Sequence, residues 1–239
     1  MKLDLNCDLG EGEPLTRTRA LMRWISSANV ACGAHAGNLA TMQGCVRLAA
    51  QFGVRLGAHP GPASRSDFGR GPIKITPDEL ELQLLRQVGA LDRLARAAGV
   101  RLHHVKLHGG FYQASEHDGV MARRYVESVA RWWPGTKVYA RAGGRVAAAA
   151  RKAGVTVWEE AYVDRGYRDD GMLIARGERG ALWTHASDVA ARVRTLLDDG
   201  VIETEAGGQL RLSPRSLCIH SDTPGAPHIA RAVARLLRG

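Results

Sequence analysis

Histidine and lysine side chains suited to catalysis stand near several points where the chain must change direction. Each is followed within four residues by glycine or proline, and the set is His35, His59, Lys106, His108 and His220. Asp8 and Asp222 stand in segments of the same kind. Carboxylates and neutral imidazoles together can bind a divalent metal or transfer protons, and a lysine can stabilise an oxyanion. These residue types favour hydrolysis or transfer at a carbonyl carbon.

Several other chemistries lack their sequence signatures. The chain contains no GxSxG nucleophile motif, and no spacing pairs a cysteine with a histidine for nucleophilic catalysis. It contains neither GxxxxGKS nor GxxxxGKT, the phosphate-binding loop, and Gly143-Gly144 is typical of a tight turn. If the reaction needs ATP, this chain has no familiar ATP-binding loop to hold it.

Short apolar runs alternate with helical patterns, as in a parallel sheet built from βαβ units. We predict seven strands, at residues 2–6, 28–32, 54–59, 102–108, 136–140, 155–158 and 217–220. Residues 201–212, with Gly207-Gly208 at their centre, predict a small added β-hairpin. We therefore expect an α/β fold in which residues 1–239 form a single domain, a closed or nearly closed seven-stranded (β/α) barrel. An open, doubly wound sheet is the alternative.

Capping residues indicate where several helices begin. Asn38 precedes an apolar stripe, and Thr76-Pro77-Asp78-Glu79 is a capping box with proline at the first helical position. Further helices are predicted from Ser115 to before Pro134, from Ser187 to before Gly200, and from Asp222 or Thr223 onward.

In β/α barrels the active site lies at the carboxyl ends of the strands. The predicted strand ends bring the five basic residues named above to one rim, beside Asp8 and Asp222. Because side chains alternate along a strand, His104 shares a strand face with Lys106 and His108. For His104 a structural and a functional role are both open. Structural or exposed positions are expected for His103, His117, His185 and His228.

Composition excludes several classes of protein. Lys and Arg outnumber Asp and Glu by 33 to 24, but the basic residues are spread out and aromatics make up only 5%. Nucleic-acid binding is therefore disfavoured. No apolar stretch is long enough to span a membrane, and the first residues do not form a signal peptide, so we expect a cytoplasmic protein. The cysteines lack CxxC spacing and are expected to be free thiols, at Cys7, Cys32, Cys45 and Cys218.

Taken together, the rim segments resemble motifs of the LamB/YcsF family, the A subunit of bacterial 5-oxoprolinase. The similarity runs in order along the whole chain. It comprises Asn6 to Glu11, Ser27 to Asn38, Gly57 to Gly61 with Phe68-Gly69-Arg70, His104 to Gln113, Glu160 with Asp164-Arg165 and Tyr167, and His220 to Ala226.

The resemblance implies a TIM-like barrel related to glycoside hydrolase and deacetylase barrels. It also implies ATP-dependent opening of the lactam of 5-oxoproline to glutamate, carried out with two partner subunits, B and C. The lactam is an unreactive amide, so phosphorylation of its oxygen by ATP would activate it. Because the chain lacks a phosphate loop, we expect the partners to help handle ATP. The sequence leaves open whether the chain also forms a homo-oligomer.

The resemblance also suggests roles at the rim. Asp8 is the expected general base, Lys106 stabilises the oxyanion, and His59 and His108 are acid/base partners or metal ligands. Arg70 or Arg165 pairs with the substrate carboxylate. The other residues expected to bind substrate are Asn6, His35, Tyr112, Asp164, His220 and Asp222. If a divalent metal is present, the expected ligands are Asp8, His35 and His59.

Two alternative functions stay open. One is a stand-alone, metal-dependent deacetylase or amidohydrolase. The other is a diverged, non-catalytic binding subunit, because several loop positions depart from the family pattern. These positions include Ala34, Asn38, Pro62, Gly71, Leu107, Gly110, Gln113 and Ser221.

Overall fold

Seven parallel strands close into a barrel in the computed structural model, which describes residues 3–238. They hydrogen-bond in the order β1-β2-β3-β4-β5-β6-β9, and β9 closes the barrel by pairing with both β6 and β1. The predicted (β/α) barrel is confirmed, and the open sheet is wrong. The strands are β1 (Asp4–Leu9), β2 (Ser27–Ala31), β3 (Arg55–His59), β4 (Leu102–Lys106), β5 (Lys137–Arg141), β6 (Val157–Tyr162) and β9 (Ser216–His220).

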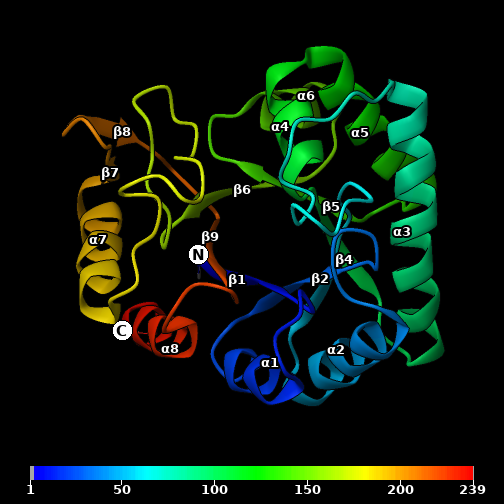
Figure 1. The fold of residues 1–239 in the computed structure, drawn as a ribbon, viewed down its shortest axis with the longest axis horizontal. Coiled ribbons are helices and arrows are strands. Elements are labelled where there is room, and N and C mark those ends of the chain that lie inside the picture. The colour runs from blue at the N-terminus through cyan, green and yellow to red at the C-terminus, as the bar shows by residue number, and fades with distance from the viewer. Residues whose placement is uncertain (1–2, 239) are drawn as a thin grey trace.

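Helices form a ring around the outside of this barrel (Figure 1). The hairpin of β7 (Val201–Glu203) and β8 (Gln209–Arg211) lies at the edge of the ring, and its strands are antiparallel. No helix among residues 3–238 is both long and apolar enough to cross a membrane. The helices are α1 (Leu15–Met22), α2 (Leu39–Phe52), α3 (Pro77–Ala97), α4 (Gly109–His117), α5 (Gly119–Trp132), α6 (Arg145–Lys152), α7 (Ala186–Asp199) and α8 (Ala226–Leu236).

Side-chain alternation on β1 separates two environments. Leu5, Cys7 and Leu9 belong to the apolar core of the protein. Asp4, Asn6 and Asp8, which alternate with them, are also buried but polar. Buried polar groups are costly unless they are hydrogen-bonded, so this set requires partners from other strands. The partners of Asn6 and Asp8 form the floor of the site described below.

The predicted caps of α2 and α3 are confirmed. The Asn38 side chain accepts a hydrogen bond from the Thr41 backbone, and Thr76 and Glu79 form the reciprocal capping box. The predicted start at Ser115 is wrong, because Ser115 lies inside α4 and Asp118 caps α5.

Two further predicted helix starts differ from the structure, by one residue for α7 and by three or four residues for α8. α7 begins at Ala186, and the Ser187 hydroxyl donates to its neighbour Asp188 instead of capping the helix. α8 begins only at Ala226, after Gly225 in the left-handed region, and the side chains of Asp222 and Thr223 have other partners. Asp222 pairs with Arg70, and the Thr223 hydroxyl donates to Asp164.

Candidate functional site

A cavity of about 280 Å³ lies at the mouth of the barrel, the end formed by the carboxyl ends of the strands. This volume suits a small molecule. The chain segments meet there because parallel strands of a closed barrel all end on the same side. The predicted site residues that line the cavity are Asp8, His59, Arg70, Lys106, His108, Tyr112, Arg165 and His220.

Lys106 and two carboxylates form a buried ionic cluster at the floor of the cavity. Lys106 Nζ lies 3.0 Å from Asp8 Oδ1, 3.1 Å from Glu160 Oε2 and 3.0 Å from Cys218 Sγ. Burial opposes ionisation of Asp8, but His59 and Lys106 outweigh it and hold its pKa well below its usual range. Burial would likewise lower the pKa of Lys106, but Asp8, Cys218 and Glu160 raise it. Asp8 and Lys106 are therefore both charged at neutral pH.

Asp164 orients His220, which lies beside Asp8 at the end of the neighbouring strand β9. His220 Nδ1 lies 3.0 Å from Asp164 Oδ1, and the Thr223 hydroxyl donates to Asp164 Oδ2 at 2.7 Å. Burial raises the pKa of Asp164, but His220 and Thr223 outweigh it, so the net shift is downward. His220 Nε2 lies 3.6 Å from Asp8 Oδ2. A carboxylate thus holds one ring nitrogen of His220, and the ring lines the cavity. This is the arrangement of an oriented acid/base histidine.

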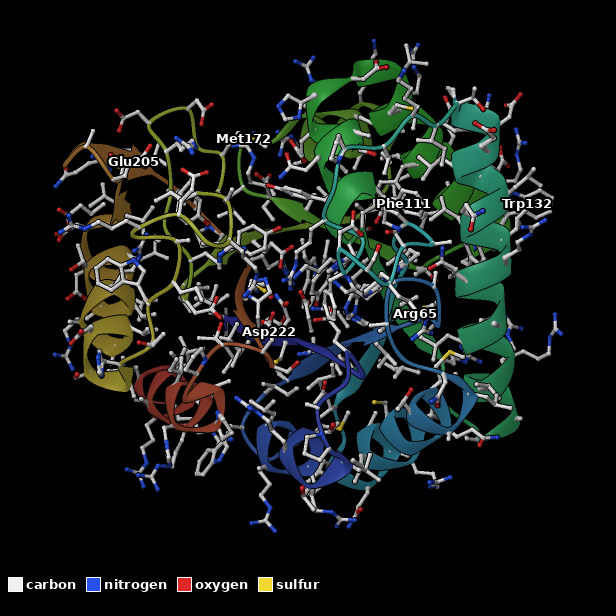
Figure 2. All side chains as sticks on the ribbon, viewed as in Figure 1. Arg65, Phe111, Trp132, Met172, Glu205 and Asp222 are labelled. Atoms are coloured by element: carbon white, nitrogen blue, oxygen red, sulfur yellow. The ribbon has the colours of Figure 1, made fainter. Side chains whose placement is uncertain are left out.

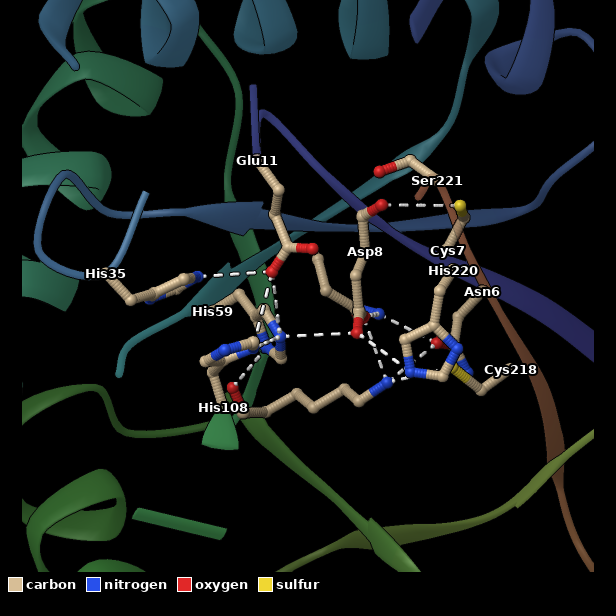
Figure 3. A network of polar contacts seen from close by, with 12 residues as sticks. Asn6, Cys7, Asp8, Glu11, His35, His59, His108, Cys218, His220 and Ser221 are labelled. Carbon is tan, nitrogen blue, oxygen red and sulfur yellow. Dashed lines mark hydrogen bonds and ion pairs between the residues drawn. The ribbon is translucent and has the colours of Figure 1, made fainter. Parts of the chain in front are cut away.

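Three imidazoles converge on the Glu11 carboxylate (Figure 3). Glu11 Oε1 lies 3.1 Å from His35 Nε2, 3.3 Å from His108 Nδ1 and 3.7 Å from His59 Nε2. Burial and then Asp8 raise the pKa of Glu11 well above its usual range. Burial and His59 lower the pKa of His35 to about 3, and the same causes lower the pKa of His108. The cluster therefore favours the uncharged forms of Glu11, His35 and His108.

Two groups in the described part of the chain have metal-ligand geometry, with ligand atoms within 4.8 Å of one another. The expected trio of Asp8, His35 and His59 is not one of them, because His35 Nε2 faces Glu11. His59 instead groups with Glu11 and His108. The two groups are Glu11, His59 and His108, and Asp8, Cys218 and His220.

Positive charge exceeds negative charge on one wall of the cavity. Arg70 and Arg176 both pair with Asp222, at 2.8 and 3.0 Å, and Asp222 lies at the mouth of the barrel (Figure 2). Arg165 donates only to the backbone carbonyls of Ala181 and Ile174. Within residues 3–238 no carboxylate pairs with Arg165, so its buried charge suits an anionic ligand.

The remaining predicted residues take different positions. Tyr112 lines the cavity, and its buried hydroxyl has no hydrogen-bond partner within residues 3–238, which suits contact with a ligand. Asn6 lies below the cavity, where its amide donates to Glu160 and Ser216. His35 and Asp164 stand behind the cavity wall and contact Glu11 and His220, respectively.

His104, whose role the sequence left open, is a positioning residue. Its Nε2 lies 2.5 Å from Asn29 Oδ1, and its ring stacks on Tyr139 with centroids 3.8 Å apart. Asn29 Nδ2 in turn donates to Asp8 Oδ1 at 2.7 Å. His104 thus fixes the amide orientation that holds Asp8.

Several residues of the site were not predicted as such. Glu160 was placed beyond strand six, but β6 continues to Tyr162 and turns Glu160 inward. Glu11 lies in the Asn6 to Glu11 motif, and its place three residues after Asp8 was the signal that could have marked it. Asn29, Arg176 and Cys218 were also not predicted as site residues. The sequence predicts Cys218 only as a free thiol, and this prediction is confirmed.

The fold and the site together define the class of protein. It is a closed (β/α) barrel with a small cavity at its mouth. The cavity holds an ionic cluster, an oriented histidine and an arginine with no carboxylate partner among residues 3–238. Active sites of barrel enzymes occupy this position.

The chain matches the LamB/YcsF family over residues 3–239 and belongs to that family. It is 42% identical over 234 residues to the A subunit of 5-oxoprolinase from Streptomyces avermitilis, covering 97% of this chain and 94% of that protein. It is 39% identical over 242 residues to the protein of the same name from Nitrobacter winogradskyi, covering 100% and 95%. The lactam utilization protein from Thermus thermophilus has the same fold, with a TM-score of 0.89 at 37% identity, covering 100% of this chain and 96% of that one.

Proposed function

We propose that this chain is the A subunit of an ATP-dependent 5-oxoprolinase, which hydrolyses the lactam of 5-oxoproline to glutamate together with B and C subunits. The observation that carries the proposal is a buried arginine, Arg165, which has no carboxylate partner in the described part of the chain and faces the same small cavity as the Asp8–Lys106 ion pair. 5-Oxoproline has a carboxylate, which suits the arginine, and an amide carbonyl, which suits the ion pair. Full-length similarity to proteins named as the A subunit of 5-oxoprolinase supports it.

In this proposal Arg165 binds the substrate carboxylate. Its guanidinium can form a charge-assisted pair, which its carbonyl partners do not supply. Tyr112 offers its free hydroxyl to the same ligand. Arg70 is the weaker candidate, because Asp222 already neutralises it at 2.8 Å. The substrate carboxylate thus orients the lactam in the cavity.

The Asp8 cluster carries out the chemistry. ATP would phosphorylate the amide oxygen, and water would then attack the activated carbonyl carbon. Asp8 Oδ2 accepts the proton of this water, and Lys106 stabilises the negative charge on the oxygen. When the C–N bond breaks, His220 Nε2, 3.6 Å from Asp8 Oδ2, returns a proton to the leaving nitrogen. Breaking the C–N bond leaves the carboxyl carbon as an acyl phosphate, which a second water hydrolyses. The products are glutamate, ADP and phosphate.

The B and C subunits complete the reaction by helping to handle ATP, since this sequence has no familiar phosphate loop. We place the complex in the cytoplasm, where ATP is available and the four free, buried cysteines stay reduced.

Reconstitution tests this function. The chain is mixed with B and C subunits from the same source, and glutamate is measured with 5-oxoproline and ATP. The proposal predicts ATP-dependent glutamate formation that requires this chain. A complex that assembles but forms no glutamate would overturn it, and binding of 5-oxoproline without turnover would indicate the non-catalytic subunit.

A metal-dependent amidohydrolase that works alone is the second candidate. The metal-ligand geometry of Glu11, His59 and His108 is the observation in its favour. The chain without partners or ATP would then hydrolyse simple N-acetyl or cyclic amides once a divalent metal is added. No hydrolysis under these conditions would exclude this candidate.

A further inference from the structure

Backbone hydrogen bonds fix the tautomers of two histidines at the mouth of the barrel. His59 Nδ1 lies 2.9 Å from the Lys106 carbonyl oxygen, and His108 Nε2 lies 2.8 Å from the Phe68 carbonyl oxygen. A carbonyl oxygen only accepts, so each of these nitrogens carries a hydrogen. In the neutral rings, His59 Nε2 and His108 Nδ1 are therefore bare lone pairs.

These two bare nitrogens face each other at 3.0 Å, among further acceptors. Glu11 Oε1 lies 3.3 Å from His108 Nδ1 and 3.7 Å from His59 Nε2, and Asp8 Oδ2 lies 3.3 Å from His59 Nε2. Glu11 is 7% exposed, and its second oxygen has no hydrogen-bond partner within residues 3–238. With both rings neutral and Glu11 ionised, several electron-pair donors thus meet in a buried place with no hydrogen between them. Such a place requires a cation.

We infer that Glu11, His59 and His108 bind a divalent transition-metal ion of the zinc type. Two imidazoles and one carboxylate are a recurrent catalytic zinc ligand set, and carbonyls that hold the outer imidazole nitrogens are the usual supporting contacts. A single proton, on His59 or on Glu11, would satisfy only one of these contacts, whereas a metal ion can bind all three residues. His59 and His108 both line the cavity, so a small molecule could reach the ion.

The second group, Asp8, Cys218 and His220, does not need a metal. Lys106 Nζ already lies 3.0 Å from both Cys218 Sγ and Asp8 Oδ1 and supplies the cation there. A metal in this group would be repelled by the buried ammonium. The ion therefore belongs to the group of Glu11, His59 and His108.

Metal binding here does not depend on the proposed lactam hydrolysis, although both concern one cavity. Binding of Zn²⁺ is measured without substrate, ATP or partner subunits. Glutamate formation without Zn²⁺ binding would overturn only the metal site, whereas Zn²⁺ binding without glutamate formation would overturn only the function.

The test begins with the full chain stripped of metal by a chelator. Isothermal titration with Zn²⁺ should show about one tightly bound equivalent per chain. On Zn²⁺ addition, ¹⁵N spectra of the histidine rings should show His59 metallated through Nε2 and His108 through Nδ1. This measurement needs no variant, so a folding defect cannot obscure it.

Variants then separate the two groups. Glu11→Gln and His108→Gln should weaken Zn²⁺ binding by more than the roughly 10- to 100-fold typical of losing a supporting contact. Cys218→Ser and His228→Gln, at an exposed position on α8, are the matched controls and should bind normally. The inference is overturned if the wild type binds no stoichiometric Zn²⁺, if only Cys218→Ser loses it, or if all variants bind alike.

Discussion

Lys106 Nζ lies between two buried carboxylates, 3.0 Å from Asp8 Oδ1 and 3.1 Å from Glu160 Oε2. The three charges come from three different strands, β4, β1 and β6. Because the ammonium is the counterion of both acids, removing it leaves two uncompensated buried charges. The ion pair that serves the chemistry in the proposed function thus also links three strands of the barrel.

The substitution Lys106→Met is therefore expected to lower the free energy of unfolding by about 3–5 kcal/mol, as for other broken buried ion pairs. Urea denaturation at neutral pH measures this loss. Lys152→Met, on the exposed end of α6, is the control and should change stability by less than about 0.5 kcal/mol. Equal, small effects of both substitutions would mean that the Lys106 cluster does not hold buried charge.

Arg165→Met is expected to weaken binding of 5-oxoproline to the reconstituted complex by about tenfold or more, because a charge-assisted contact of about 1.5–3 kcal/mol is lost. 2-Pyrrolidinone, the same lactam without the carboxylate, should bind the wild type and the variant alike. Calorimetric titration with both compounds checks this. A larger loss in Arg70→Met than in Arg165→Met would move the carboxylate to Arg70.

Asp164→Asn should destabilise the protein in a pH-dependent manner. The folded pKa of Asp164 is lowered, so its ionised form stabilises the fold above the unfolded pKa of about 3.9. That contribution is lost as the pH falls through the folded pKa. The difference in unfolding free energy between wild type and variant should thus be largest above about pH 5 and shrink toward pH 3.

Urea denaturation at several pH values measures the Asp164 effect, with Asp198→Asn, on the exposed side of α7, as the control. If the difference in unfolding free energy between wild type and Asp164→Asn stays constant from pH 7 to pH 3, ionisation of Asp164 does not stabilise the fold.

Thr76→Ala tests the capping box of α3 and should cost about 1 kcal/mol, because the Glu79 backbone N–H loses its acceptor. Thr76 is far from the chemistry in the proposed function, so glutamate formation should be unchanged. Thermal unfolding and the glutamate assay measure the two effects. A stability equal to that of the wild type would mean that solvent replaces the cap at no cost.

The barrel could be predicted because local signals agreed with the fold. Apolar runs bounded by caps and glycines marked all seven barrel strands, and the strand ends then placed His59, Lys106 and His220 at one mouth. Strand length was harder to predict. β6 includes polar residues such as Glu160, whose burial depends on Lys106 from a distant strand.

The segment before α4 shows how tertiary contacts override local propensity. Glycines disfavour helix, yet α4 begins at Gly109. A Cβ atom there would lie 2.1 Å from the Gly69 carbonyl oxygen, and Gly109 has φ +52°. Glycine is needed because residues 69 and 109 approach closely, which no local pattern reveals.

Arg165 and Arg176 lie in the irregular stretch between β6 and α7, which shows no hydrophobic periodicity. Isolated bridges, such as Arg165 with Leu182 and Tyr167 with Leu173, fold this stretch over the mouth. α1 was likewise not predicted, because it has no side-chain cap and buries only three residues, Thr18, Leu21 and Met22. These parts depend on contacts that form only in the folded chain.

Glutamate formation by the Asp8→Asn variant tests the central claim most directly, that the mouth of the barrel is the active site. The variant and the wild type are each assembled with B and C subunits, and assembly is verified by size-exclusion chromatography. The account predicts that the assembled variant forms glutamate at least about a hundredfold more slowly, because its amide cannot accept the proton from water. Near-normal glutamate formation by Asp8→Asn would contradict it.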